Sequence, residues 1–217
     1  MHRYNIKNAA QLARASYSAT SHPSIKPLLR ASLDKRDVQA HLLKNGILLI
    51  PGSNSLMDYL RYNLRVLRIG AKKYRMSNDK TEALNGVRWH QGFLAHAKVI
   101  QDWVAENNFK VKYIIGHSLG AAAAQILSRS WRVPAIGFAA PRPCRKNAPR
   151  PLSPLCLCIN RSDDGVCALP SSFHHSGQVK ECKARGSVFS PDHSMRHYVK
   201  AVAETQAAGK LMKNWPR

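Results

Sequence analysis

Tyr113-Ile114-Ile115-Gly116-His117-Ser118-Leu119-Gly120-Ala121-Ala122-Ala123-Ala124 is the stretch of sequence that decides the fold. It begins with apolar residues of strand length, and its alanine-rich end suits a closely packed helix. A serine between two glycines at such a turn is held exposed, because Gly116 and Gly120 leave room for a sharp bend. The pattern predicts a strand, a tight turn and a helix, with Ser118 as a candidate nucleophile.

Upstream of this unit, the apolar positions predict a first helix and a hairpin. Ile6, Ala9, Leu12, Ala13 and Tyr17 form one apolar stripe at helical spacing. Two short apolar runs, 39–43 and 47–50, flank an Asn-Gly pair, which supplies the positive φ angles of a tight turn. We therefore expect two neighbouring antiparallel strands after the helix.

The remaining elements follow from periodicity and from turn residues. A cluster of turn residues at 51–55 precedes a predicted helix at 56–67. The basic stretch 68–88 suits either a surface excursion or a cover over the active site, and in the second case a basic lid would lie around 71–75. Further predictions are a helix at 93–105, strands at 133–139 and 155–159, a hairpin joining 178–180 to 187–189, and a last helix beginning near Ser190-Pro191-Asp192.

The composition is that of an ordinary globular protein. Of the 217 residues, 44% are hydrophobic and 21% are charged, which excludes disordered and fibrous classes. A chain of this length buries roughly 70% of the surface that it exposes when unfolded, and it is short for two cores. We expect one domain over residues 1–217 and one site.

The net charge indicates anionic partners. Lys and Arg number 34 against 12 Asp and Glu, which gives +22 and a positive field over much of the surface. An anionic membrane, a polyanionic substrate and nucleic acid all fit this charge, but no recognised nucleic-acid motif accompanies it. The oligomeric state is left open.

The N-terminal region lacks the apolar stretch of a secretory signal, and no run approaches the ~18 apolar residues of a membrane span. We therefore expect a cytoplasmic protein. The acid-poor stretch before Asp34 suits either an organelle-targeting peptide or a folded first helix, and its apolar stripe favours the helix.

The cysteines are odd in number, which favours reduced thiols over a disulfide framework. They are Cys144, Cys156, Cys158, Cys167 and Cys182. A zinc site that uses Cys156, Cys158, Cys182, His174 and His175 is disfavoured, because the first two lie on an apolar strand without the usual Cys-x-x-Cys spacing. We expect no metal and no organic cofactor.

A serine nucleophile needs a base, and the usual chain order in this kind of site is Ser, then Asp, then His. Asp163 and Asp164 both follow the strand 155–159 and its short continuation, where an acid would be presented. The later histidines are His174, His175, His193 and His197. From the residues alone, both acids and all four histidines stay open.

Five stretches in the right order resemble the fungal-type (class 3) lipases, a family of α/β-hydrolases, over about residues 9–202. The stretches are Ile50-Pro51-Gly52-Ser53 with 56–60, His90-Gln91-Gly92-Phe93, Tyr113 to Ala122, Ala139-Ala140-Pro141-Arg142, and Asp164 to Pro170. Behind them, Asp192-His193 with Tyr198 is similar to the family's terminal His followed by Tyr. Ile50, Pro51 and Cys167 depart from the family pattern.

The resemblance implies an α/β fold of α/β-hydrolase type, with a mixed, mainly parallel central sheet flanked by helices. It implies a triad of Ser118, Asp164 and His193, with His197 second to His193, and oxyanion donors at Ser53 and Leu119. His90 is structural in this pattern. The implied activity is hydrolysis of carboxylic esters, of glycerolipids or phospholipids, through an acyl-enzyme. The alternative is an inactive hydrolase-like module that binds anionic lipid or nucleic acid through its basic surface.

Overall fold

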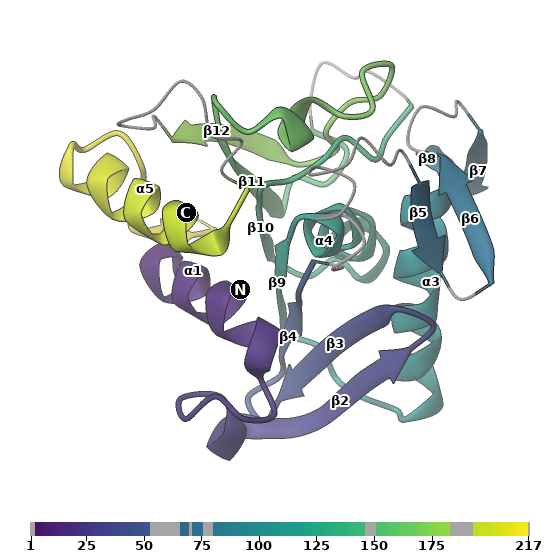
Figure 1. Ribbon diagram of the computed structural model, residues 1–217, viewed down its shortest axis with the longest axis horizontal. Helices are drawn as coiled ribbons and strands as arrows, with labels where there is room; N and C mark the ends of the chain where they lie inside the picture. The colour runs from purple at the N-terminus through teal and green to yellow at the C-terminus, as the bar shows by residue number, and fades with distance from the viewer. Residues whose placement is uncertain are drawn as a thin grey trace.

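The computed structural model describes residues 3–52, 66–69, 71–75, 80–145, 151–182 and 193–216. Within these residues, seven strands form one sheet in the order β12-β11-β10-β9-β4-β3-β2 (Figure 1). The strands are β2 (Leu29–Lys35), β3 (Val38–Leu43), β4 (Ile47–Ile50), β9 (Tyr113–His117), β10 (Ala135–Phe138), β11 (Cys156–Arg161) and β12 (Gln178–Cys182). The pairs from β4 to β12 are parallel, whereas β2–β3 and β3–β4 are antiparallel. The sheet is therefore mixed and mainly parallel, as predicted.

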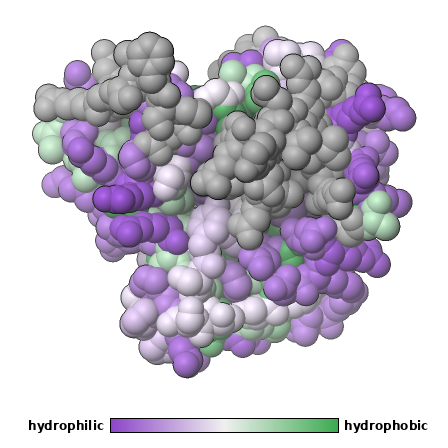
Figure 2. All heavy atoms as spheres, in the orientation of Figure 1, coloured by the Kyte–Doolittle hydropathy of each residue, from purple (hydrophilic) through white to green (hydrophobic). Residues whose placement is uncertain are grey.

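Helices cover both faces of this sheet (Figure 1). On one side α1 (Ile6–Ala15) packs beside α5 (Met195–Ala207), and on the other α3 (Gln91–Glu106) packs beside α4 (Leu119–Trp131). Most of the coloured residues on the face shown in Figure 2 are hydrophilic. None of the described helices has the length and apolar character needed to cross a bilayer.

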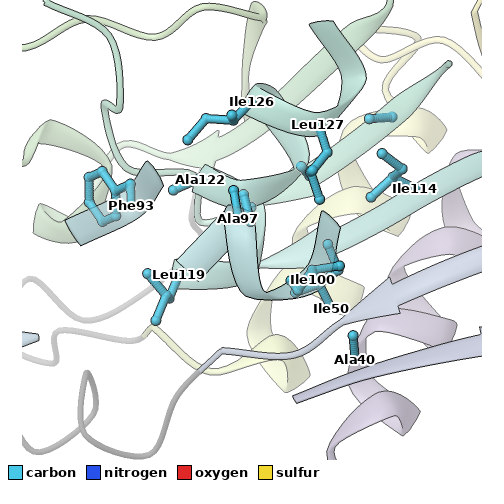
Figure 3. Close-up of a cluster of buried hydrophobic side chains, with 14 of the residues drawn as sticks. Ala40, Ile50, Phe93, Ala97, Ile100, Ile114, Leu119, Ala122, Ile126 and Leu127 are labelled. Atoms are coloured by element: carbon cyan, nitrogen blue, oxygen red, sulfur yellow. The ribbon is translucent and has the colours of Figure 1, made fainter. Parts of the chain in front are cut away.

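The alternation of side chains along the strands divides the core into two layers. Leu48 and Ile114 belong to the cluster that packs against α3 and α4, and part of this cluster, including Ile114, is drawn in Figure 3. Their neighbours Leu49 and Ile115 belong to the cluster that packs against α1 and α5. Because β4, β9, β10 and β11 are buried on both faces, they read as mainly apolar runs in the sequence, whereas the parallel edge strand β12 is largely exposed.

The smaller elements lie around the sheet. Two hairpins, β5 (Val66–Ile69) with β6 (Lys72–Arg75) and β7 (Thr81–Leu84) with β8 (Val87–His90), occupy most of the predicted surface excursion. A two-residue pair joins β1 (Tyr4–Asn5) to β13 (Asn214–Trp215), near the two ends of the chain. The short 3-10 turns are η1 (Ser16–Ser18), η2 (Lys26–Leu28) and η3 (Gly165–Ala168).

Most predicted elements are confirmed. The Asn-Gly turn joins β3 to β4, with Gly46 at φ +86°. The apolar stripe near the N-terminus is a folded helix that Asn5 caps, because its side chain accepts a hydrogen bond from the N–H of Asn8. Tyr17 is an exception to the stripe: it lies in η1, beyond the helix, and 41% of its surface is exposed.

Two predictions need correction, and of the predicted C-terminal hairpin only one arm is described. The last helix begins at Met195 and not near Ser190, because Ser194 is its N-cap and accepts a hydrogen bond from the N–H of Arg196. The helix predicted at 56–67 is wrong at its end, since Val66 and Leu67 pair with β6, and its residues up to 65 lie outside the described residues. The first arm of the predicted hairpin is β12, which pairs in parallel with β11; the second arm, 187–189, lies outside the described residues.

Candidate active site

Ser118 stands at a strained turn between β9 and α4. Its φ of 56° and ψ of −121° lie in a region that residues with a Cβ atom seldom adopt. Such a conformation costs on the order of 1–3 kcal/mol and persists only where the surroundings enforce it. The backbone enters the turn from a buried strand and leaves it in a buried helix, so the rest of the fold holds the serine in this conformation.

The two glycines beside Ser118 are required by close backbone contacts. A Cβ atom on Gly116 would lie 2.4 Å from the carbonyl oxygen of Gly120, and one on Gly120 would lie 2.1 Å from that of Ile50. Backbone atoms cannot move aside as a flexible side chain can. The glycines therefore let α4 approach the ends of β4 and β9, which places Ser118 at the carboxyl edge of the sheet.

A line of hydrogen bonds joins Ser118 to His193 and Asp164. The Nε2 atom of His193 lies 2.6 Å from Ser118 Oγ, and its Nδ1 atom lies 2.8 Å from Asp164 Oδ2. The carboxylate can only accept, so Nδ1–H donates to it, and Nε2 is left to accept from the serine hydroxyl. All three residues are at least 95% buried, although they come from separate parts of the chain.

Asp164 is held by two further donors. It caps η3, where its Oδ1 atom accepts from the N–H of Val166 at 3.0 Å, and Tyr198 donates its hydroxyl hydrogen to Oδ2 at 2.8 Å. Desolvation raises the pKa of Tyr198 well above its usual range, with Cys167 and Asp164 as lesser causes, so the hydroxyl stays a donor. The sequence resemblance included Tyr198 but gave it no role. Its position on α5, five residues after His193, brings its hydroxyl to the carboxylate of Asp164.

The other candidates lie elsewhere. Asp163 forms a two-pronged ion pair with Arg161, at 3.0 and 2.6 Å. His175 donates from Nε2 to the carbonyl oxygen of Ala140, and His174 bridges to Cys144 through its backbone. His197 lies on α5, within the helix that follows His193.

A second hydrogen-bond chain lies behind Ser118. The Nδ1 atom of His117 lies 2.5 Å from the hydroxyl of Tyr17, and its Nε2 atom lies 3.0 Å from the carbonyl oxygen of His193. The Tyr17 hydroxyl also accepts from the N–H of Gly52 at 2.9 Å. Sequence analysis missed this chain, because Tyr17 is 100 residues from His117 and no local pattern connects them.

Of the two predicted oxyanion donors, Leu119 lies within the described residues and Ser53 does not. Leu119 is the first residue of α4, where backbone N–H groups have no acceptor one turn back and the helix dipole is positive. Ser53 lies outside the described residues, but the preceding Gly52 is packed against the site. A Cβ atom on Gly52 would lie 2.9 Å from Ser118 Cβ, so the end of the chain segment after β4 adjoins the nucleophile.

The described residues contain no group of His, Cys, Asp and Glu side chains that could hold a metal ion. All five cysteines are free and buried. Burial is the main cause that raises the pKa of Cys167 and of Cys182 above the usual range of a thiol, so these two are held in the protonated form.

The strand order, the covering helices and the strained serine turn at a carboxyl sheet edge define an α/β-hydrolase fold. The fold is that of fungal lipases: the structure of a Rhizomucor miehei lipase propeptide complex matches with a TM-score of 0.53, over 88% of this chain and 74% of that chain. The Lip2 lipase of Yarrowia lipolytica matches with 0.51, over 87% and 80%, and a fungal lipase–inhibitor complex with 0.50, over 83% and 82%. Sequence identity is 16% in each case, so the likeness establishes the fold alone. No protein-family model matches the chain, and no curated protein sequence matches it.

Proposed function

We propose that this protein hydrolyses carboxylic esters, with Ser118 as nucleophile, His193 as general base and Asp164 as the acid that orients it. The observation that carries the proposal is the unbroken hydrogen-bond line from Ser118 Oγ through the His193 ring to Asp164. Structural roles alone do not require a serine at positive φ to face a buried histidine and carboxylate. The shared fold with proteins described as lipases favours the same class of chemistry.

In the first half of the reaction, Ser118 Oγ attacks the ester carbonyl carbon while His193 Nε2 takes the hydroxyl proton. Asp164 stabilises the imidazolium that forms, and the same proton then passes to the leaving alkoxide. Water attacks the acyl-enzyme in the second half, again with His193 as base. The products are a carboxylic acid and an alcohol, and the enzyme is regenerated without any cofactor.

The tetrahedral intermediate needs donors for its oxyanion. We assign this role to the backbone N–H of Leu119 and to Ser53, through its backbone N–H and its hydroxyl. Each such donor contributes about 3 kcal/mol to transition-state stabilisation in serine hydrolases. The position of Gly52 against Ser118 supports the assignment of the residue that follows it.

For the substrate, we propose lipid esters at an anionic surface, of glycerolipid or phospholipid type. The net charge of +22 supports this choice. So does a cavity of about 240 Å³ between β6 and the start of α3, which is lined by Lys72, Lys73, Arg75 and Lys80 and by no acidic residue among those described. Lys72, Lys73 and Arg75 form no ion pair within the described part of the chain.

The activity is tested by labelling the purified protein with a fluorophosphonate, beside the variant Ser118→Ala. We expect labelling of the wild type only, and turnover of p-nitrophenyl esters whose rate across acyl chain lengths defines the preference. A folded wild-type protein that is not labelled at Ser118 would contradict the proposal and favour the inactive binding module.

The surface preference is tested by co-sedimentation with neutral and anionic phospholipid vesicles. We expect binding to anionic vesicles that weakens as salt is raised, because screening shortens the reach of the charge. Lys72→Glu with Lys73→Glu should lower this binding several-fold more than Lys210→Glu with Lys213→Glu, two exposed lysines outside the cavity. Equal binding to both vesicle types would overturn this choice of substrate surface.

A further inference from the structure

Three separate parts of the chain must stay in register for the proposed chemistry. Gly52 follows β4 and directly precedes the predicted oxyanion residue Ser53, the nucleophile stands after β9, and the base stands before α5. These three parts are far apart along the polypeptide, so no short covalent connection fixes their positions relative to one another. Their mutual positions depend on contacts, and one chain of hydrogen bonds that reaches both Gly52 and His193 from the residue before Ser118 runs through Tyr17 and His117.

The donors in this chain are fixed by chemistry. The carbonyl oxygen of His193 can only accept, so His117 carries its proton on Nε2 and donates there. The lone pair on His117 Nδ1 then accepts from the hydroxyl of Tyr17. The oxygen of that hydroxyl accepts in turn from the N–H of Gly52. Every donor has an acceptor, and the neutral form of the imidazole is the one that satisfies all of them.

The burial of His117 supports the same protonation state. Its side chain is 2% exposed, and its pKa lies well below the usual value because desolvation disfavours the charged ring and because His193 lies nearby. A second proton on Nδ1 would face the Tyr17 oxygen and leave the hydroxyl hydrogen without its acceptor. The hydrogen-bond chain from Gly52 through Tyr17 and His117 to His193 is therefore an uncharged link.

The link fixes atoms directly beside the reacting groups. His117 precedes the nucleophile and holds the backbone of the base through its carbonyl oxygen, while Ser194 caps the helix that follows. Gly52 is confined between the Tyr17 hydroxyl and Ser118, since an added Cβ atom would lie 2.7 Å from the former and 2.9 Å from the latter. A displacement of Tyr17 would therefore shift Gly52 on one side of Ser118 and, through His117, the backbone of His193 on the other.

We propose that Tyr17 and His117 are positioning residues that hold the Gly52 segment and the backbone of His193 in register with Ser118. The expected effect on the reaction rate rests on the proposed function, whereas the expected effect on the positions of Gly52 and His193 does not. Neither residue needs to touch the substrate with a polar atom, because both side-chain polar ends are already paired with each other and with backbone groups.

The primary test compares Tyr17→Phe with Tyr113→Phe on a short-chain p-nitrophenyl ester. Tyr113 is a matched control, because its buried hydroxyl also donates to a backbone oxygen, that of Trp215 at 2.8 Å, and lies at the other end of β9. We expect Tyr17→Phe to lower kcat about tenfold, since a misplacement of about 1 Å can already cost about 10²-fold in rate. KM should stay within about twofold because the ring is kept. Tyr113→Phe should change neither constant.

Variants at His117 separate the two halves of the link. His117→Gln keeps an amide donor for the carbonyl oxygen of His193, whereas His117→Leu removes both hydrogen bonds, so the Gln variant should retain several-fold more activity. In the His117→Leu background, Tyr17→Phe should cause little further loss, because residues of one network are not additive. Additive losses, or a kcat for Tyr17→Phe equal to that of Tyr113→Phe, would overturn the proposal.

A measurement without turnover keeps this proposal separate from the proposed function. In the Ser118→Ala background, amide hydrogen exchange at Gly52 and at 193–196 should be faster with Tyr17→Phe than with Tyr113→Phe. If the wild type is not labelled by the fluorophosphonate but exchange rises as expected, the ester hydrolase proposal fails and the positioning link stands. Unchanged exchange at both places would refute the link whether or not the protein is an enzyme.

Discussion

At the scale of single residues, neighbouring side chains of one type can have opposite roles. Asp163 and Asp164 follow the same strand, and the sequence pattern alone does not separate them. Asp163 turns to Arg161, whose hydrogen bond is the main cause that lowers the pKa of the Asp163 carboxyl. Asp164 turns inward to His193 and Tyr198 and is 5% exposed. One step along the backbone thus exchanges an acid in a partly buried ion pair for a buried acid.

This difference gives a test at the residue scale. Asp164→Asn keeps the shape of the acid but offers an amide where His193 needs an acceptor, which favours the wrong tautomer of the imidazole. We expect kcat on p-nitrophenyl esters to fall about 10⁴-fold, as the same change does in a well-studied serine protease. Asp163→Asn, which weakens only the pair with Arg161, should stay within about threefold of the wild type. A comparable loss in the two variants would argue against Asp164 as the orienting acid.

At the scale of elements, local patterns predicted the central strands and helices because these are buried and strongly periodic. Strands β4, β9 and β10 read as apolar runs, α3 shows helical spacing, and α4 follows the serine turn as an alanine-rich helix. The strand β2 went unpredicted, since it is an edge strand with mostly exposed positions. The start of α5 was misplaced because Ser190 and Ser194 are both plausible caps, and only the packing of Met195 and Tyr198 into the core distinguishes them.

The candidate site was predictable to the extent that local pattern carries it. The turn around Ser118 has its own signature, and the resemblance supplied an order for the acid and the base. The contacts of Tyr17 and Tyr198 could not be predicted, because they depend on how α1 and α5 pack on one face of the sheet. The catalytic roles themselves stay predictions until the labelling experiment is done.

The packing of α4 against β4 gives the test at the element scale. Gly120→Ala places a Cβ atom 2.1 Å from the carbonyl oxygen of Ile50, so the helix must move away from the sheet. We expect the free energy of unfolding to fall by more than about 3 kcal/mol, beyond the usual cost of overpacking. Gly165→Ala is the control, because no atom lies within 4 Å of its added Cβ. Urea unfolding of both variants measures the difference, and a similar stability for the two would show that the helix can shift freely.

At the scale of the whole molecule, charge and burial act on different properties. Most of the described Lys and Arg side chains are exposed, and there their charge governs encounter with anionic partners in a way that depends on salt. Several histidines are instead enclosed by the fold, among them His96, His117 and His175, and desolvation is the largest cause that lowers the pKa of each. Surface charge therefore sets association, while buried imidazoles make folding depend on pH.

His96 allows this pH dependence to be tested. It is 1% exposed, its Nδ1 atom has no hydrogen-bond partner among the described residues, and burial lowers its pKa to about 3. An unfolded histidine takes up its proton below about pH 6.5, whereas the folded one does so only near its lowered pKa. Between these values the unfolded state binds more protons, so stability is complete above about pH 6.5 and falls as pH decreases towards 3. Each such histidine contributes a slope of about 1.4 kcal/mol per pH unit. In the variant His96→Leu, the free energy of unfolding, measured with urea at pH 7, 6 and 5, should depend less steeply on pH, by the contribution of one proton. An unchanged pH dependence would mean that His96 takes up its proton in the folded protein as readily as in the unfolded one.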